Sequence, residues 1–394
     1  MKFFPNLIKS AVLALDEIIN GGMMADKVVE TLLKSNTKWG SRDRNFVADA
    51  VYDCIRNRRF FQAKANIDSL ETLENLYKLI SVHLFFKYNE IPDLPEFKGF
   101  ELVSVPDILE RKILESYPDW LDSLLEKELG AEIWNQEAKA QNAPSEVVLR
   151  VNTLKTTKKE AKAALLKLEI ETKEIENNPD ALVLLKRKNL QNLELYKNGF
   201  IEIQDASSQL IANFLELNPG LNVIDACAGA GGKAIHIAAL MKNSGKITAL
   251  DISEFKLNQA KIRAKRAGVR ILATQLANDF SKLKNSADRL LLDVPCSGLG
   301  VLRRNPDSKW KLTPDFMVEI IKTQAEILEN YSEMLKVGGI LVYATCSILP
   351  SENNLQIDLF LKNNPNFEFI KDRKLFAYKD DFDGFYMAKL KRNR

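Results

Sequence analysis

The stretch Leu290-Leu-Leu-Asp-Val-Pro-Cys-Ser-Gly-Leu-Gly300 decides how the carboxyl-terminal half of this chain is interpreted. Its run of three leucines predicts a short strand that is buried on both faces. A proline then ends the strand and a glycine permits a turn, so Asp293 and Cys296 are expected at the strand's carboxyl edge. Ligands of open α/β sheets bind at this edge. A carboxylate and a thiol placed there indicate a site of chemistry.

Around this stretch, strand and helix patterns alternate from about residue 209 onward. The strands are expected at residues 221–224, 246–250, 270–274, 290–292 and 339–344. The intervening helices are expected from after Lys233 to about residue 241, at 253–267 and at 314–335. This order is typical of a parallel sheet with crossover helices. The carboxyl-terminal half is therefore predicted to be an α/β domain.

The amino-terminal half carries helical patterns. Helices are expected at residues 6–20, 25–35, 70–86 and 106–129. A further helix, third in chain order, is expected to begin with Ser41 as its N-cap and to place Cys54 in the core. Between the two halves, strands at 147–151, 181–185 and 200–204 and a helix at 158–168 predict a small α+β module. Five arginines lie at the ends of the third helix, and they predict either a solvated surface or a phosphate-contacting patch. They are Arg42, Arg44, Arg56, Arg58 and Arg59.

Composition narrows the class of protein. The chain has 394 residues and a net charge of +3, which is too small to identify a nucleic-acid partner without a local cluster. No apolar run is long enough to span a membrane, and the amino terminus lacks the features of a signal peptide, so a cytoplasmic location is expected. The four cysteines are widely spaced and never form a C-x-x-C pair, which predicts neither disulfides nor a metal site.

A glycine-rich loop follows the first strand of the α/β domain. It reads Asp225-Ala-Cys-Ala-Gly-Ala-Gly-Gly-Lys233, which matches neither a P-loop nor G-x-G-x-x-G. Small residues before a helix amino terminus allow a ligand to approach the backbone closely. Asp251 ends the next strand, where a carboxylate can accept hydrogen bonds from the ribose of an adenosine-containing cofactor. The alternative is that Asp251 only complements a helix dipole.

Two cysteines end neighbouring strands. Cys296 follows the fourth strand and Cys346 follows the fifth, and each is followed by a serine. A buried structural cysteine is the usual interpretation of one such residue, but it is a poor explanation of the pair. The residues alone do not say which thiol reacts first.

These motifs resemble the Nop/Sun family of S-adenosylmethionine-dependent RNA cytosine-5 methyltransferases. The resemblance covers roughly residue 144 to the carboxyl terminus. It is carried by the glycine-rich loop together with four further motifs, which are Asp293-Val-Pro-Cys-Ser-Gly298, Arg303-Arg-Asn-Pro-Asp307, Tyr343-Ala-Thr-Cys-Ser-Ile-Leu-Pro350 and Asp383-Gly-Phe385. Together with Ser41-Arg-Asp-Arg44, the motif order is most similar to the bacterial members that methylate 16S ribosomal RNA.

The resemblance implies a mechanism. Cys346 would add to C6 of the cytosine and make C5 nucleophilic. Cys296 would assist release of the product, and Asp293 would hold the base by its N3 and N4 edge. S-adenosylmethionine would supply the methyl group, and the target base would be unpaired or flipped.

The resemblance also implies the cofactor contacts and the domains. The expected cofactor-binding residues are Cys227, Ala228, Gly229, Ala230, Gly231, Gly232, Lys233, Asp251, Asp279 and Asp293. The expected domains are a helical NusB-like RNA-binding domain at 1–130, a small α+β RNA-recognition module at 131–208 and a Rossmann-like methyltransferase domain at 209–394. A monomer acting on ribosomal RNA is expected. The alternatives are a transfer-RNA methyltransferase of the same family and a non-catalytic NusB-like assembly factor.

Overall fold

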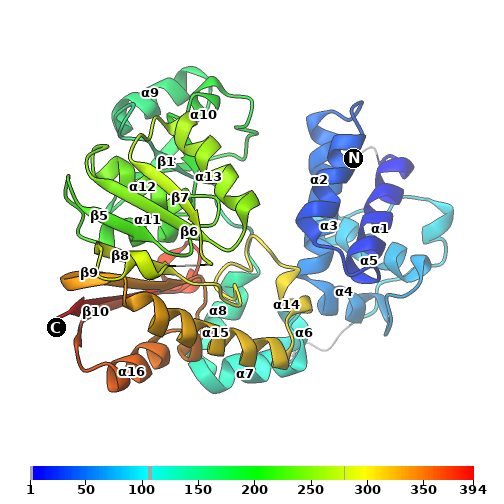
Figure 1. The fold of residues 1–394 in the computed structure, drawn as a ribbon. Helices are drawn as coiled ribbons and strands as arrows, with labels where there is room; N and C mark the ends of the chain where they lie inside the picture. Colours follow the sequence, from blue (N-terminus) through cyan, green and yellow to red (C-terminus); the bar gives the residue numbers. More distant parts are fainter. Residues whose placement is uncertain (1–2, 105–108, 279) are drawn as a thin grey trace. The chain divides into compact units, whose positions relative to one another are not determined.

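The structure is a computed structural model, and it describes residues 3–104, 109–278 and 280–394 (Figure 1). The chain forms two compact units. The first contains Met1–Pro144 and Leu302–Thr313, and the second contains Ser145–Val301 and Pro314–Arg394. The helical part therefore extends beyond the expected boundary at residue 130, and it also takes in a segment from the middle of the carboxyl-terminal half.

The first unit is helical, as the sequence predicts. Its larger helices are α1 (Pro5–Ile19), α2 (Ala25–Ser35), α3 (Ser41–Arg56), α4 (Arg58–Ala65), α5 (Leu73–Tyr88), α7 (Asp119–Leu129) and α8 (Ala131–Gln141). The apolar faces of α1, α3 and α5 meet in one core, and Cys54 is fully buried there, which confirms its structural interpretation. The expected N-cap at Ser41 is wrong: Gly40 is the N-cap, and the Asp43 carboxylate accepts a hydrogen bond from its N–H at 3.1 Å.

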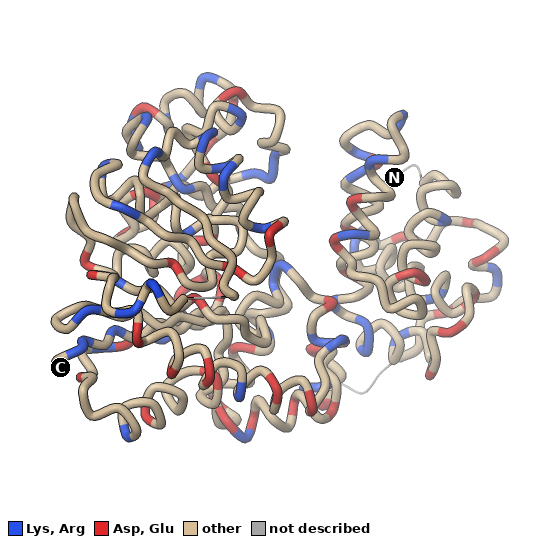
Figure 2. Tube along the Cα trace, in the orientation of Figure 1, with Lys and Arg blue, Asp and Glu red and all other residues tan. Residues whose placement is uncertain are grey.

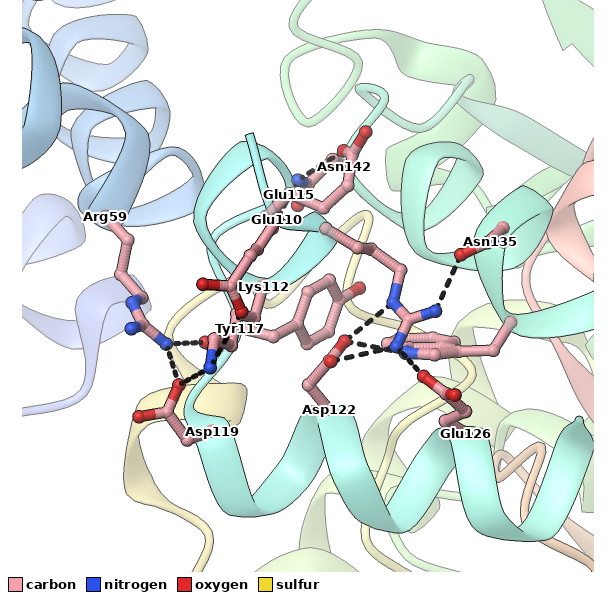
Figure 3. Close-up of polar contacts among 12 residues, drawn as sticks. Arg59, Glu110, Lys112, Glu115, Tyr117, Asp119, Asp122, Glu126, Asn135 and Asn142 are labelled. Carbon is pink, nitrogen blue, oxygen red and sulfur yellow. Dashed lines mark hydrogen bonds and ion pairs between the residues drawn. The ribbon is translucent and has the colours of Figure 1, made fainter. Parts of the chain in front are cut away.

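A polar network joins the short helix α6 (Arg111–Leu114) to α7 and α8 (Figure 3). The Arg111 guanidinium donates to both oxygens of Asp122, at 2.8 and 2.9 Å, and to Asn135 at 2.6 Å. The indole of the fully buried Trp134 donates to the same Asp122 carboxylate at 2.8 Å. A bidentate arginine–carboxylate pair that also accepts an indole N–H fixes the geometry of three helices at once. This network explains why the helical unit continues past residue 130.

Lys309 anchors the inserted segment Leu302–Thr313 in the helical unit. Its ammonium group is buried and donates to the carbonyl oxygens of Arg56 at 2.9 Å and Glu115 at 3.2 Å, and to Asn142 Oδ1 at 3.1 Å. It also lies 4.3 Å from the ring centroid of Tyr117. Burial lowers the pKa of Lys309, and the nearby Arg56 charge acts in the same direction. Three oxygen acceptors and an aromatic face offset the loss of water around this buried amino group.

Replacement of Lys309 by alanine is expected to destabilise the helical unit by about 3–5 kcal/mol, because it removes a buried donor that joins acceptors from three segments. Urea unfolding, read together with amide hydrogen exchange in α3 and α8, measures the loss. Lys34→Ala is the matched control, since the Lys34 side chain is 75% exposed and pairs with Glu30 on the same helix. A loss below about 1 kcal/mol for Lys309→Ala would contradict the anchoring role.

The structure does not support a phosphate-binding patch at the five arginines. Arg44 donates to the carbonyl groups of Leu33, Asn36 and Trp39, and Arg56 donates to those of Leu302 and Arg303. Arg59 donates to the carbonyl of Tyr117 and to Asp119, and Arg58 stacks over the Trp310 ring. Of the five, Arg42 is the exposed one. Elsewhere in the described chain, basic and acidic residues are interspersed (Figure 2).

The second unit begins with a four-stranded antiparallel sheet in the order β2-β3-β1-β4. Its strands are β1 (Val148–Val151), β2 (Thr172–Ile175), β3 (Asn178–Leu184) and β4 (Ile201–Ile203), and helix α9 (Lys158–Lys167) packs against it. Strand β2 was not expected from the sequence, because its two central residues are exposed and its pattern carries little apolar signal. The predicted α+β character of this module is confirmed.

A seven-stranded sheet forms the rest of the second unit, in the order β10-β11-β9-β8-β5-β6-β7. Its strands are β5 (Asn222–Asp225), β6 (Lys246–Asp251), β7 (Leu272–Leu276), β8 (Ala287–Asp293), β9 (Leu335–Thr345), β10 (Phe367–Leu375) and β11 (Phe385–Arg392). The first five pair in parallel, and β10 and β11 add an antiparallel edge. The chain reverses its order between β5 and β8, and such a switch point is where open sheets bind ligands.

Helices cover both faces of this sheet (Figure 1). Leu290 and Leu292 of β8 pack with helices α15 (Pro314–Ser332) and α16 (Asn354–Asn363). Leu291 points to the other face and packs with α11 (Ala206–Phe214) and α12 (Gly232–Leu240). Because side chains alternate along a strand, this confirms that the leucine run is a strand buried on both faces.

Candidate active site

Four strands of the large sheet deliver reactive side chains to one edge. Asp225, Asp251 and Asp293 are the last residues of β5, β6 and β8, and Cys346 follows the last residue of β9. Since these strands are parallel neighbours, their carboxyl ends coincide. The structure therefore brings together the aspartates and cysteines that the sequence placed at separate strand ends.

The two thiols are in direct contact. The Sγ atoms of Cys296 and Cys346 lie 2.9 Å apart, and both cysteines are free. Their backbones are locked together as well, because the N–H of Gly300 donates to the carbonyl of Cys346 at 2.9 Å and Gly384 donates to Gly300 at 2.7 Å. A Cβ atom on Gly300 would lie 2.0 Å from the carbonyl oxygen of Gly384, so only glycine permits this approach. Three separate sequence motifs thus meet around the thiol pair.

Lys233 supplies positive charge beside this pair. Its ammonium group is 2.5 Å from Asp293 Oδ2, and it also interacts electrostatically with Cys346. Burial alone would lower the pKa of Lys233, but the neighbouring Asp293, together with Asp225 and Cys346, raises it overall. Lys233 therefore stays charged and can stabilise a negative sulfur atom.

The two thiols differ in their surroundings. The pKa of the Cys296 thiol is raised well above its usual value by its hydrogen bond to Cys346, by burial and by the charge of Glu352. Burial also raises the pKa of Cys227, together with nearby carboxylates. Cys227 is therefore held as a neutral thiol in the glycine-rich loop, consistent with a backbone rather than a nucleophilic role.

The glycine-rich loop is held from three directions. Asp251 Oδ2 accepts from the N–H of Gly229 at 2.9 Å, and Arg263 donates to the carbonyl of Ala230, also at 2.9 Å. Arg150, from the small module, donates to the carbonyl of Gly232 at 2.7 Å. Gly231 has a φ of 78°, and a side chain there would meet Ala260 at 2.8 Å. The loop is thus fixed before any ligand binds, with the amino terminus of α12 behind it.

Asp225 is a residue of this site whose side chain received no role from the sequence. It is fully buried, and among the described residues none donates a hydrogen bond of normal geometry to either oxygen, although the N–H of Ala234 approaches. Burial, together with the charge of Asp293, raises its pKa to about 7. Its position at a strand end before the loop was visible in the sequence, but its lack of partners required the structure.

Replacement of Asp225 by asparagine is expected to stabilise the second unit at pH 8, by up to about 4 kcal/mol. The folded protein retains the Asp225 proton up to about pH 7, because burial raises its pKa, whereas the unfolded chain releases the proton near the ordinary aspartate pKa of 3.8. Stability of the wild type therefore falls as pH rises from about 4 to 7, and the variant lacks this loss. Urea unfolding at pH 5, 6.5 and 8 checks the trend, with the exposed Asp315→Asn as control. A difference independent of pH would contradict it.

The remaining expectations have mixed outcomes. The Asp251 carboxylate accepts hydrogen bonds from two backbone N–H groups, those of Gly229 and Ser253, so it holds the glycine-rich loop in place as well as lying at its edge.

Asp279 lies outside the described residues. Within the described ranges, no cluster of three or more His, Cys, Asp or Glu could hold a metal ion. No helix in those ranges is long and apolar enough to cross a membrane.

Both the sequence and the fold of this chain are similar to those of known proteins. The family model for 16S rRNA methyltransferase RsmB/F matches residues 212–391, and a ferredoxin-like domain model of RsmF/B-like methyltransferases matches residues 117–191. The chain is 33% identical over 323 residues to the probable ribosomal RNA small subunit methyltransferase B of Bacillus subtilis. That alignment covers 76% of this chain and 70% of the relative.

Two solved structures from Pyrococcus horikoshii share the fold. A methyltransferase homologue is 28% identical with a TM-score of 0.65, covering 74% of this chain and all of that one. NSun6, solved with the S-adenosylmethionine analogue SFG, is 22% identical with a TM-score of 0.65, covering 71% of this chain and all of that one. The Rossmann-like methyltransferase fold expected from the sequence is thereby confirmed. The chain belongs to the RsmB/F family of 16S rRNA methyltransferases within the Nop/Sun group, whose methyl donor is S-adenosylmethionine.

Proposed function

We propose that this chain methylates carbon 5 of a cytosine in 16S ribosomal RNA. The observation that carries the proposal is the contact of the Cys296 and Cys346 sulfur atoms, 2.9 Å apart, at the carboxyl edge of the sheet. One thiol suffices for nucleophilic addition, so a second thiol in contact with it needs a role of its own. Addition to a cytosine followed by elimination gives both thiols a role.

The residues of the site fit S-adenosylmethionine. This cofactor is cationic and, when bound, supplies an electrophilic methyl group. Asp225, Asp251 and Asp293 place three acidic side chains around the glycine-rich loop. Among the described residues, none donates a hydrogen bond of normal geometry to the buried oxygens of Asp225. A cation near Asp225 would offset the cost of ionising this carboxylate in a buried position. The backbone from Cys227 to Lys233 and the Asp251 carboxylate are the proposed binding surface.

Cys346 is the proposed nucleophile. The charged Lys233 interacts with this sulfur, whereas the pKa of the Cys296 thiol is raised well above its usual value by its hydrogen bond to Cys346 and by burial. The thiolate adds to C6 of the cytosine, and the electron pair of the C5–C6 double bond shifts so that C5 becomes nucleophilic. After methyl transfer to C5, water takes the C5 proton, the C5–H electron pair re-forms the C5–C6 double bond, and the C6–sulfur bond breaks to release Cys346.

Cys296 and Asp293 have supporting roles in this proposal. The Cys296 thiol lies close enough to Cys346 to deliver a proton to its sulfur as the C6–sulfur bond breaks. Asp293 lies at the end of β8 with one oxygen on Lys233, and its carboxylate can accept from the cytosine amino group. The target base must leave its stack to reach this edge.

The substrate assignment follows from the family. We propose that the helical unit is NusB-like and binds RNA, that the ferredoxin-like module contributes to RNA recognition, and that the protein acts as a cytoplasmic monomer. Transfer RNA is the alternative substrate. A non-catalytic assembly factor is less satisfactory, because a scaffold has no need of two thiols in contact beside a lysine.

Bisulfite sequencing of 16S ribosomal RNA and transfer RNA, with and without the gene, tests the proposal. A protected cytosine in 16S ribosomal RNA should disappear on deletion and return with the wild-type gene but not with Cys346→Ala. Loss of a transfer-RNA signal would support the alternative substrate. An unchanged pattern in both RNAs would overturn cytosine-5 methylation as the function.

A further inference from the structure

Glu352 is a buried carboxylate that links the two cysteine loops. It lies in a short 3-10 helix (Pro350–Glu352) after β9 and has no exposed surface. The hydroxyl groups of Ser297 and Ser347 both donate to its Oε1. The N–H of Ser297 donates to its Oε2 at 2.8 Å, and the side-chain amide of Gln324 donates to the same oxygen at 2.9 Å. Four donors from three segments therefore converge on one side chain.

Each of these donors is uncharged. A buried carboxylate without a paired cation is costly, and it persists only when hydrogen bonds satisfy its oxygens. Here two donors reach each oxygen, so this carboxylate is well satisfied. An apolar residue at the same position would remove the acceptor that two serine hydroxyls, an amide and a backbone N–H share. Such an arrangement indicates a role beyond filling the core.

The donors identify what Glu352 holds. Ser297 directly follows Cys296, and Ser347 directly follows Cys346. Gln324 of α15 also donates to the carbonyl of Pro295 at 2.9 Å, on the other side of Cys296. The link between the two loops therefore runs from one cysteine's neighbour to the other's through a single carboxylate.

We propose that Glu352 is a positioning residue that acts through Ser297 and Ser347 to keep the two thiols in contact and to place negative charge on the Cys296 side of the pair. This inference rests on the proposed function, because it assumes that both thiols react. In this proposal Glu352 makes the two thiols differ: Cys296 keeps its proton, and Cys346 acts as the nucleophile.

The charges around the pair agree with this assignment. Cys346 and Glu352 face Cys296 from β9 and from the 3-10 helix, and both raise its pKa. Lys233, from α12, instead faces Cys346 and Asp293. Tyr343 interacts electrostatically with both Glu352 and Cys296, and its own pKa is raised well above the usual value by burial and by these charges, so it is neutral. Negative charge thus lies beside Cys296 and positive charge beside Cys346.

Variants of Glu352 separate position from charge. Glu352→Gln can keep all four contacts, because its oxygen can accept from the two N–H donors while its NH₂ group donates to the serine hydroxyls, which rotate. Glu352→Ala removes the link altogether. We expect kcat to fall about 100-fold in Glu352→Ala and about tenfold or less in Glu352→Gln, with KM for S-adenosylmethionine unchanged within about twofold in both. Ser347→Ala removes one of the hydrogen bonds to Glu352, and its kcat should lie between those of the two Glu352 variants.

Melting temperature and a second buried glutamate control for folding. Glu137→Gln makes the same change at a fully buried position of the helical unit and should leave kcat unchanged. A Glu352→Ala variant that folds and keeps kcat within about twofold of the wild type would overturn the proposal. If Glu352→Ala fails to fold, Ser347→Ala answers the question. A rise in KM for S-adenosylmethionine with unchanged kcat would also overturn it, since the link would then serve the cofactor site.

Thiol alkylation tests the charge effect without RNA or methyl transfer. The comparison uses Cys346→Ala proteins with and without Glu352→Gln, and mass spectrometry measures how much of Cys296 iodoacetamide has modified at each pH. Glu352→Gln should let the reaction occur at a lower pH than in the protein that keeps Glu352. An unchanged pH profile would overturn the charge assignment. If instead the wild type methylates no cytosine while the alkylation shift is present, the proposed function fails and the role of Glu352 in setting the thiols stands.

Discussion

Cys346→Ala is expected to lower the rate of methyl transfer to RNA by a factor on the order of 10⁴ or more, because the cytosine ring then has no nucleophile to activate C5. Transfer of labelled methyl from S-adenosylmethionine to RNA from cells lacking the gene measures the rate. Binding of S-adenosylmethionine, followed by calorimetry, should stay within about threefold of the wild type. The loss is expected in kcat rather than in cofactor affinity, since Cys346 follows β9 and lies outside the glycine-rich loop.

Cys54→Ala is the control for this variant. Cys54 is fully buried in the helical core, and its thiol pKa is raised well above the usual value by burial, so it takes no part in catalysis. Methyl transfer by Cys54→Ala should equal that of the wild type. Retention of more than a tenth of wild-type activity by Cys346→Ala would mean that Cys346 is not the attacking thiol. Because Cys296 lies 2.9 Å away, it would then be the candidate for that role.

Cys296→Ala is expected to trap the protein on its RNA. If Cys296 assists expulsion of the Cys346 thiolate, its removal slows elimination but leaves addition and methylation intact. A covalent RNA–protein complex should then accumulate to a large fraction of the enzyme, visible as a slower band on denaturing gels. The wild type should show little of it at steady state.

The double variant distinguishes a genuine intermediate from a side product. Cys296→Ala with Cys346→Ala should form no complex, because the attacking sulfur is missing. A complex that persists in the double variant would show that another group forms the bond. The absence of a complex in the single variant would contradict the proposed division of labour, while leaving Cys346→Ala to report on the nucleophile itself.

The family motifs and the sheet could be predicted because their signals are local. The leucine run before Asp293 and the alternation of strands with amphipathic helices specify strands buried on both faces. Strands β10 and β11, in contrast, were not expected. The seven inner residues of β10 are exposed and include charged side chains, so its sequence resembles a surface segment, and only pairing with β11 makes it a strand.

The sequence by itself determined which reactive groups this protein has and that they end parallel strands, because strand ends are encoded by a few neighbouring residues. It did not determine what those groups touch. Four of the five clustered arginines proved to hold the helical unit together, since a guanidinium that satisfies buried carbonyls looks the same in sequence as one that awaits a phosphate. Contacts between residues far apart in the chain, such as Lys309 with Arg56 or Glu352 with Ser297, depend on packing, and so only the tertiary structure decided them.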